Sequence, residues 1–332
     1  MDREQEEMQF LGLFGIYKES CKIIFTWRKI FTQITLALIL PLSFIFLIHM
    51  EVSDLLVSKI GLTEVEMDET RFGSPTYNKL AQLASKEWTA YLIFEAAYFT
   101  FLLVFSLLST SAVVYTIACA YTGRAVDFRK VVSVVPRVWK RLMATFLSIF
   151  IGLLCYNMVS IIVLIFWAIS IGSMDFGIFL LFVLLGLYIV GFVYMTIVWQ
   201  LACVVSVLEE DCGVKAMIKS RELLRGNMGV AVVIFFKLNT ALVLIELAFG
   251  MLVIDGESSR LVSRIGYGIL CFLLLVTLIL FGLVVQAVLY FVCKSYHHEN
   301  IDKSALSDHL EVYLGEYVPL KSKDVQLEQY HV

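Results

Sequence analysis

Long apolar runs alternate with short charged segments along this chain. Six runs reach the roughly 20 apolar residues that a helix needs to cross a bilayer, and several are longer, so they are expected to tilt or to extend past it. The pattern therefore predicts an all-α, polytopic membrane protein with six transmembrane helices. The predicted spans cover residues 30–50, 89–122, 142–171, 176–208, 228–254 and 263–293.

Composition supports a membrane environment. Of the 332 residues, 60% are hydrophobic and 17% are charged, whereas soluble domains average about 45–50% and about 25%. A single soluble core of this length could not bury that much apolar surface. The net charge of −3 argues against a general attraction to nucleic acid, so nucleic acid is not an expected partner.

The distribution of Lys and Arg predicts the orientation. Nineteen of these residues fall in the amino-terminal segment, the second and fourth connections and the tail, and six fall in the remaining connections. Cytosolic segments are enriched in Lys and Arg, so both termini are predicted to be cytosolic. We expect a cytosolic segment with an interfacial helix (1–29), a six-span membrane domain (30–293) and a cytosolic tail (294–332). The expected location is the endoplasmic reticulum, another endomembrane or the plasma membrane.

Three basic segments resemble one another. Residues 128–143 and 214–229 superpose at an offset of 86, and residues 20–33 share a Trp-basic-basic-apolar motif with the first of them. Each is amphipathic and precedes a pair of spans, which suggests three repeats of one interfacial helix plus two spanning helices. The alternative is that charged residues flank every span and the match is coincidental.

The connection at residues 51–88 is predicted to be a long, exposed loop with an excess of acidic residues. Within it, Ser74 and Pro75 have the sequence of a helix start, namely a capping residue followed by proline at the first helical position. That helix is expected to continue into the second span. The acidic residues either attract cations or form an ordinary solvated surface, and the second interpretation is favoured.

Charged residues within or beside the spans are the candidates for function. Glu95, Lys237 and Glu246 lie inside predicted spans, where charge is costly and often marks a ligand or ion site. Structural pairing or snorkelling to the membrane surface is the alternative. His49 has no obvious carboxylate companion by sequence. The other candidates are lipid contacts in the basic segment between the fourth and fifth spans, namely Lys215, Lys219, Arg221 and Arg225.

Sequence motifs of catalysis and metal binding are missing. The chain contains no glycine-rich phosphate loop, no H-E-x-x-H, no C-x-x-C and no G-x-S-x-G. His297-His298-Glu299 lacks further ligands at a suitable spacing, and none of the seven cysteines lies in a predicted outer loop, which disfavours disulfides. A non-enzymatic protein without metal or cofactor is therefore expected.

Two resemblances extend this interpretation. The stretch from Val207-Leu208-Glu209 through Gly213, Ala216 and Ser220 to Gly226-Asn227 resembles a signature of bacterial proteins related to the membrane domain of glycerophosphodiester phosphodiesterases. MQFLGLFGIYKES and FVCKSYHHENIDKS resemble the ends of a plant family of six-span membrane proteins without an established activity. The resemblance implies a helical membrane domain that handles or organises lipids, without the separate domain that carries out hydrolysis.

Two functions remain open at this point. The first is a non-enzymatic membrane protein whose cytosolic interfacial helices bind or organise lipids or partner proteins. The alternative is a transporter or channel for an amphipathic or small charged solute.

Overall fold

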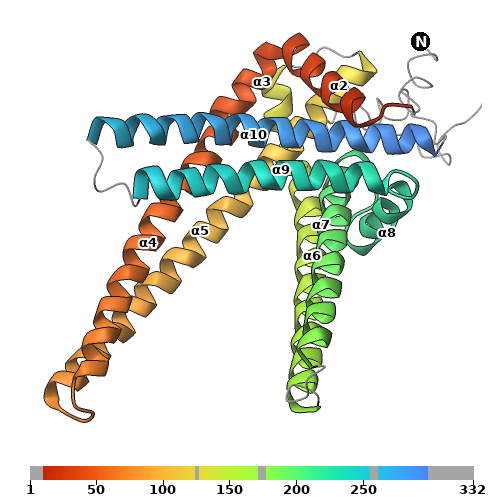
Figure 1. The fold of residues 1–332 in the computed structure, drawn as a ribbon. Coiled ribbons are helices and arrows are strands. Elements are labelled where there is room, and N and C mark those ends of the chain that lie inside the picture. The colour runs from red at the N-terminus through yellow and green to blue at the C-terminus, as the bar shows by residue number, and fades with distance from the viewer. Residues whose placement is uncertain (1–9, 124–126, 171–176, 255–260, 298–332) are drawn as a thin grey trace, which may run out of the picture. The chain divides into compact units, whose positions relative to one another are not determined.

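The computed structural model describes residues 10–123, 127–170, 177–254 and 261–297. Within these ranges the regular elements are helices and no strand occurs, which confirms the all-α prediction. The elements in chain order (Figure 1) are α2 (Leu13–Thr26), α3 (Arg28–Ile34), the π-helix η1 (Thr35–Ile39), α4 (Leu40–Glu69), α5 (Pro75–Thr122), α6 (Phe128–Ser170), α7 (Gly177–Leu208), α8 (Val214–Leu223), α9 (Met228–Phe249), the π-helix η2 (Gly250–Ile254) and α10 (Leu261–Tyr296).

Six helical stretches in the described part of the chain are long and apolar enough to cross a membrane, as predicted. At 1.5 Å per residue, the 32 residues of α7 extend about 48 Å and the 48 residues of α5 about 72 Å. Both exceed the hydrocarbon thickness of about 30 Å. The protein is therefore a multi-pass membrane protein. Its candidate spans are Arg28–Glu69, Pro75–Thr122, Val138–Ser170, Gly177–Leu208, Met228–Ile254 and Val262–Tyr296.

The helices divide between two compact units. The first unit comprises Met1–Ile30, Thr110–Ile234 and Val284–Val332, and the second comprises Phe31–Ser109 and Phe235–Leu283. The boundaries fall inside α3, α5, α9 and α10, so these helices contribute to both units.

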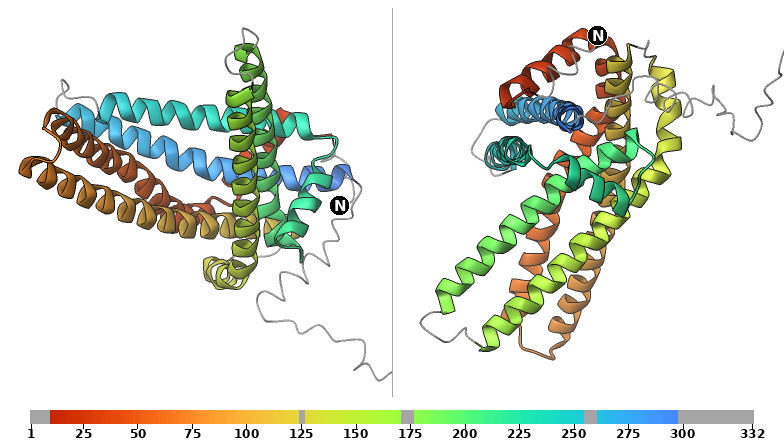
Figure 2. Two further views of the ribbon diagram at one scale, coloured as in Figure 1. Left: turned by 90° about the horizontal axis from the view of Figure 1, so that it is seen from below. Right: turned by 90° about the vertical axis from the view of Figure 1, so that its right-hand side faces the viewer.

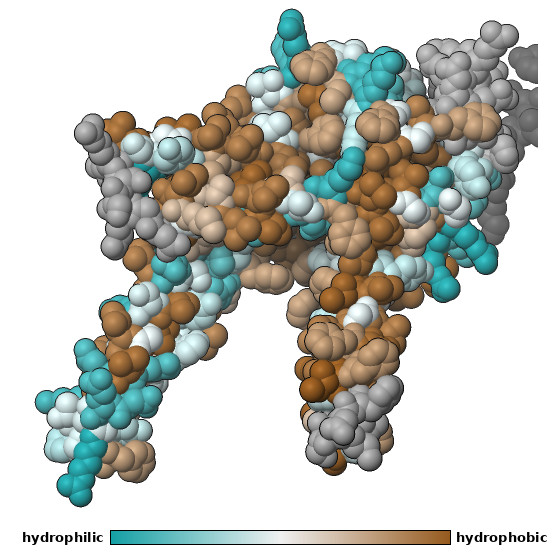
Figure 3. Space-filling view, in the orientation of Figure 1, coloured by the Kyte–Doolittle hydropathy of each residue, from teal (hydrophilic) through white to brown (hydrophobic). Residues whose placement is uncertain are grey.

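In the first unit, α6 and α7 run side by side as a hairpin and the short helix α8 lies against both (Figure 2). The last two turns of α7, residues 201–208, are buried throughout. Most large side chains along the rest of the hairpin are exposed and apolar, including Phe166 at 68% and Phe182 at 69% (Figure 3). Such a surface is suited to lipid and not to water. The amino-terminal α2 is amphipathic and buries Ile16, Ser20 and Ile23 along one stripe.

In the second unit, α4 and the first part of α5 form a hairpin, and α9 runs beside α10 (Figures 1 and 2). A buried cluster of Leu47, Phe249, Cys271 and Leu275 joins α4, α9 and α10. The far end of the α4–α5 hairpin is polar (Figure 3). There Glu87 forms an ion pair with Lys59 at 3.3 Å, which joins the two helices.

The prediction of a long exposed loop at residues 51–88 is wrong. Helix α4 continues to Glu69 and α5 begins at Pro75, so only five residues separate them. The sequence contains no proline between residues 42 and 74, and its charged residues are compatible with a solvated helix. The predicted helix start is confirmed, because Ser74 Oγ accepts a hydrogen bond from Tyr77 N at 3.0 Å.

The three predicted interfacial helices differ from one another. Residues 128–143 are part of the continuous helix α6, so the prediction of a separate surface helix there is wrong. Pro136 lies inside α6 and does not end it. Residues 20–33 are interrupted at Trp27, between α2 and α3. In the third segment, α8 is a short helix that ends before the following span begins, and α2 likewise ends before the candidate span Arg28–Glu69. Apolar spacing is the same in a surface helix and in the end of a long spanning helix, which explains the error.

Candidate functional site

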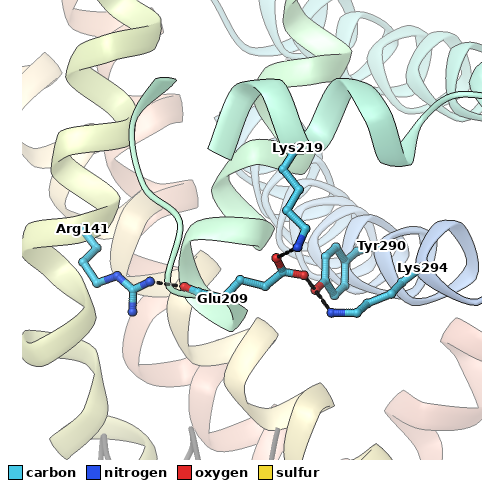
Figure 4. A network of polar contacts seen from close by, with 5 residues as sticks. All are labelled: Arg141, Glu209, Lys219, Tyr290 and Lys294. Atoms are coloured by element: carbon cyan, nitrogen blue, oxygen red, sulfur yellow. Dashed lines mark hydrogen bonds and ion pairs between the residues drawn. The ribbon is translucent and has the colours of Figure 1, made fainter. Parts of the chain in front are cut away.

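Glu209 follows the last residue of α7 and is the centre of a polar cluster in the first unit (Figure 4). Its side chain is only 11% exposed. Lys219 Nζ, from α8, lies 2.6 Å from Glu209 Oε2, and Lys294 Nζ, from α10, lies 2.8 Å from Glu209 Oε1. Tyr290, one turn before Lys294, donates a hydrogen bond to the same Oε1. One carboxylate therefore joins the end of α7 to both α8 and α10.

The charges of this cluster favour an ionised carboxylate. Burial raises the pKa of Glu209, but hydrogen bonds from Lys219, Lys294 and Tyr290 outweigh that effect and lower its pKa below the ordinary 4.5. In addition, Arg141 of α6 donates to the backbone oxygen of Glu209. A cation at the carboxyl end of α7 also interacts favourably with the helix dipole.

Hydroxyl groups hold the turn between α7 and α8 against α6. Thr145 Oγ1 lies 2.6 Å from Ser206 Oγ and accepts a hydrogen bond from Gly213 N at 2.8 Å. Gly213 has φ +64°, a conformation that L side chains rarely adopt. Ser220, on α8, donates to the carbonyl oxygen of Val198 at 2.8 Å. These bonds fix the direction in which α8 leaves α7.

Helix α8 has a buried face and a basic exposed face. Ala216, Ser220 and Leu223 are buried, with a spacing that places them on one side of the helix. Lys215 and Arg221 are exposed, as is Arg225 just beyond the helix. The carboxyl end of α8 contacts the residue that follows α10. His297 Nε2 lies 3.1 Å from the carbonyl oxygen of Leu223.

A cavity of about 460 Å³ opens beside the carboxyl end of α8. Gly226, in its wall, has φ +99°, and a Cβ there would lie 2.6 Å from Tyr296 Cε1, so this position requires glycine. The lining therefore combines charged and apolar side chains with the backbone of Gly226. The lining residues are Tyr194, Ile218, Arg221, Glu222, Leu224, Arg225, Gly226 and Met228.

The four basic residues expected to contact lipid fall into two groups. Lys215, Arg221 and Arg225 are exposed, and the two arginines line the cavity. Lys219 instead forms the ion pair with Glu209 and is 29% exposed, so its Nζ is engaged within the protein. Sequence reasoning did not identify Glu209 as a site residue. The sequence feature that could have identified Glu209 is the position of an acidic residue directly after a long apolar run.

The charged residues expected inside the spans belong to the second unit. Glu95, on α5, lies with Oε1 2.9 Å from His49 Nε2 and accepts a hydrogen bond from Ser53 at 3.4 Å. The His49 ring stacks on Tyr98 with 3.6 Å between ring centroids. The sequence offered no obvious carboxylate companion for His49, and the structure provides one that lies 46 residues away along the chain. Lys237 is exposed on α9 and Glu246 is partly buried on the same helix; their roles remain predictions.

In the part of the chain that the structure describes, no group of three or more His, Cys, Asp or Glu residues could hold a metal ion. None of the seven cysteines, all of which lie in the described ranges, forms a disulfide. His298 and Glu299 of the possible metal-binding fragment, the expected turn at residues 255–257 and the expected short helix at residues 304–310 lie outside the described residues.

Comparison with known families assigns the chain to one of them. Residues 1–330 match the family described as "Domain of unknown function (DUF8558)". The chain belongs to this family. No curated protein and no solved structure matches it. The resemblances to the membrane domain of glycerophosphodiester phosphodiesterases and to a plant family therefore remain predictions.

Proposed function

We propose that this membrane protein is non-enzymatic and binds or organises lipids through α8 and the segment that follows it. The observation that carries the proposal is the arrangement of α8. Its apolar face and Lys219 are held by the protein, whereas Lys215, Arg221 and Arg225 remain exposed. Because α7 ends at Leu208 and α9 begins at Met228, these cations lie at the level where spans end and lipid headgroups begin.

The predicted orientation gives the proposal its electrostatic basis. The excess of Lys and Arg on one side predicts that α8 faces the cytosol, where the membrane leaflet carries anionic lipid. A basic residue near that surface contributes about 1 kcal/mol. Three such residues contribute about 3 kcal/mol, or roughly a hundredfold in affinity. Proteins that dock at the cytosolic face are further partners that we propose.

Lipid that remains bound after reconstitution and mild detergent extraction tests the proposal. We expect the variant K215Q/R221Q/R225Q to retain much less anionic lipid, as measured by native mass spectrometry. The matched control R71Q/K79Q/K86Q removes the same charge from exposed positions of the α4–α5 hairpin and should retain lipid as the wild type does. Equal retention in the two variants would contradict the proposal.

A second candidate function is supported by a different observation. The His49–Glu95 pair joins two candidate spans, α4 and α5, and polar pairs within spans are of the kind that lines ion or solute pathways in transporters. Transport of an amphipathic or small charged solute would appear as flux in proteoliposomes that is lost in Glu95→Gln. Lipid retention without any flux would favour the first function.

A further inference from the structure

The cavity beside α8 differs from a plain basic patch because its charged residues are of both signs. Arg221 lies in the last turn of α8, Arg225 lies four residues further along the chain and just beyond the helix, and Glu222 lies between them in sequence; all three line the cavity. Among the residues that the structure describes, these three form no salt bridge, so no described side chain forms an ion pair with them. A ligand that compensated all three would carry two anionic groups and one cationic group.

The rest of the lining is suited to the glycerol and acyl end of a lipid. Ile218, Leu224 and Met228 supply apolar surface, and α7 contributes Tyr194. Gly226 has no side chain, and its conformation and the nearby Tyr296 ring exclude one. A volume of about 460 Å³ falls within the range of small-molecule sites, about 300–1,000 Å³.

We propose that this cavity binds the headgroup of phosphatidylserine. Its phosphate and carboxylate would each meet a guanidinium, from Arg221 and Arg225, and its ammonium would meet Glu222. The proposal deepens the lipid-binding function and rests on it. Guanidinium groups form strong paired hydrogen bonds with both phosphate and carboxylate, and the ammonium provides the counter-charge that an isolated glutamate would otherwise lack.

Charge pattern, and not net charge, separates this lipid from its competitors. Phosphatidylglycerol has the same net charge but no ammonium, so Glu222 would lie unpaired beside it. Phosphatidylethanolamine has the ammonium but only one anionic group, so one arginine would lack a partner. Phosphatidic acid lacks the ammonium as well. An unpaired, partly desolvated charge is costly, which makes these differences a source of specificity.

The experiment is competition between lipids with identical acyl chains. The full-length protein is reconstituted in phosphatidylcholine nanodiscs that contain equal amounts of phosphatidylserine and phosphatidylglycerol, and bound lipid is identified by native mass spectrometry. We expect phosphatidylserine to be enriched about tenfold over phosphatidylglycerol, the ratio that corresponds to one additional charge-assisted contact.

Three single variants assign that enrichment to the cavity. Glu222→Gln should abolish the preference for phosphatidylserine while anionic lipid still binds. Arg225→Gln should weaken the binding of both anionic lipids, and Lys79→Gln, at an exposed position of α5 outside the cavity lining, should leave the preference unchanged. Thermal midpoints of all variants show whether each remains folded.

Several outcomes separate this inference from the broader function. Equal binding of the two anionic lipids, or a preference that survives Glu222→Gln, would overturn the cavity assignment but leave lipid binding by α8 intact. Failure of every lipid to bind would overturn both. Binding of soluble glycerophosphoserine as tightly as the lipid would contradict a membrane lipid as the source of the headgroup.

Discussion

Glu209 follows the end of α7 and Glu95 lies within α5, and the two carboxylates have different partners. Glu209, in the first unit, is 11% exposed and contacts two lysines and a tyrosine. Glu95, in the second unit, is 30% exposed and contacts a histidine and a serine. Two ammonium groups therefore surround the carboxylate of Glu209, whereas Glu95 has a ring nitrogen and a hydroxyl group as partners.

This difference indicates separate roles. Glu209 is outnumbered by permanent cations and joins three helices, so it serves as a structural link that positions α8. Glu95 has fewer charged partners, and its side chain is more accessible. We therefore expect the fold to depend more on Glu209 than on Glu95, and substituting each carboxylate or its partner tests the comparison.

The largest effect is expected from Glu209→Gln. It leaves Lys219 and Lys294 close together without the carboxylate that compensates them, and breaking a buried ion pair in this way costs about 3–5 kcal/mol. Since Lys219 is 29% exposed, we expect about 3 kcal/mol, measured as a lower thermal midpoint in detergent. The neighbouring, exposed Glu210 provides the control, because Glu210→Gln should change stability by less than about 0.5 kcal/mol. Similar losses in the two variants would remove Glu209 from its structural role.

A smaller effect is expected from His49→Phe. Phenylalanine keeps an aromatic ring to stack on Tyr98 but removes the hydrogen bond to Glu95, and the loss should be about 1 kcal/mol. Glu95→Gln keeps an oxygen that accepts a hydrogen bond and should lose less than His49→Phe. The same thermal assay measures both. A loss as large as that of Glu209→Gln would mean that the second site is equally structural.

The smallest effect concerns acid pH. Because the pKa of Glu209 in the folded protein lies below its ordinary 4.5, its contribution to stability is fully present above 4.5 and is lost as the pH falls through the lowered value. The difference in thermal midpoint between wild type and Glu209→Gln should therefore be constant near neutral pH and should shrink only below about pH 4.5. A difference that already shrinks between pH 7 and 6 would contradict the lowered pKa of Glu209.

Local patterns predicted much of the fold. Apolar runs identified six spans, and Ser74-Pro75 correctly marked the start of α5. The error at residues 51–88 has a physical cause, because a polar helix in water and a polar loop have similar composition. The prediction of a separate surface helix at residues 128–143 was wrong for a related reason, because amphipathic spacing does not reveal whether a helix ends before the next span.

Local sequence patterns predicted only part of the candidate site. Basic residues in the α8 segment were recognisable from sequence, yet Lys219 proved to be held by Glu209 and not exposed like Lys215. The partners of Glu209 on α10 lie 81 and 85 residues away, and His49 lies 46 residues from Glu95. No local pattern connects residues at such distances.

The sequence alone determined that the protein is helical, crosses a membrane and carries a basic segment between its fourth and fifth spans, because hydrophobicity and charge are properties of each segment by itself. Only the tertiary structure decided which charges are engaged and which remain available. Helix packing brings Glu209, Lys219 and Lys294 together and leaves Arg221, Glu222 and Arg225 around a cavity. Those pairings depend on the facing sides of helices that are distant in sequence.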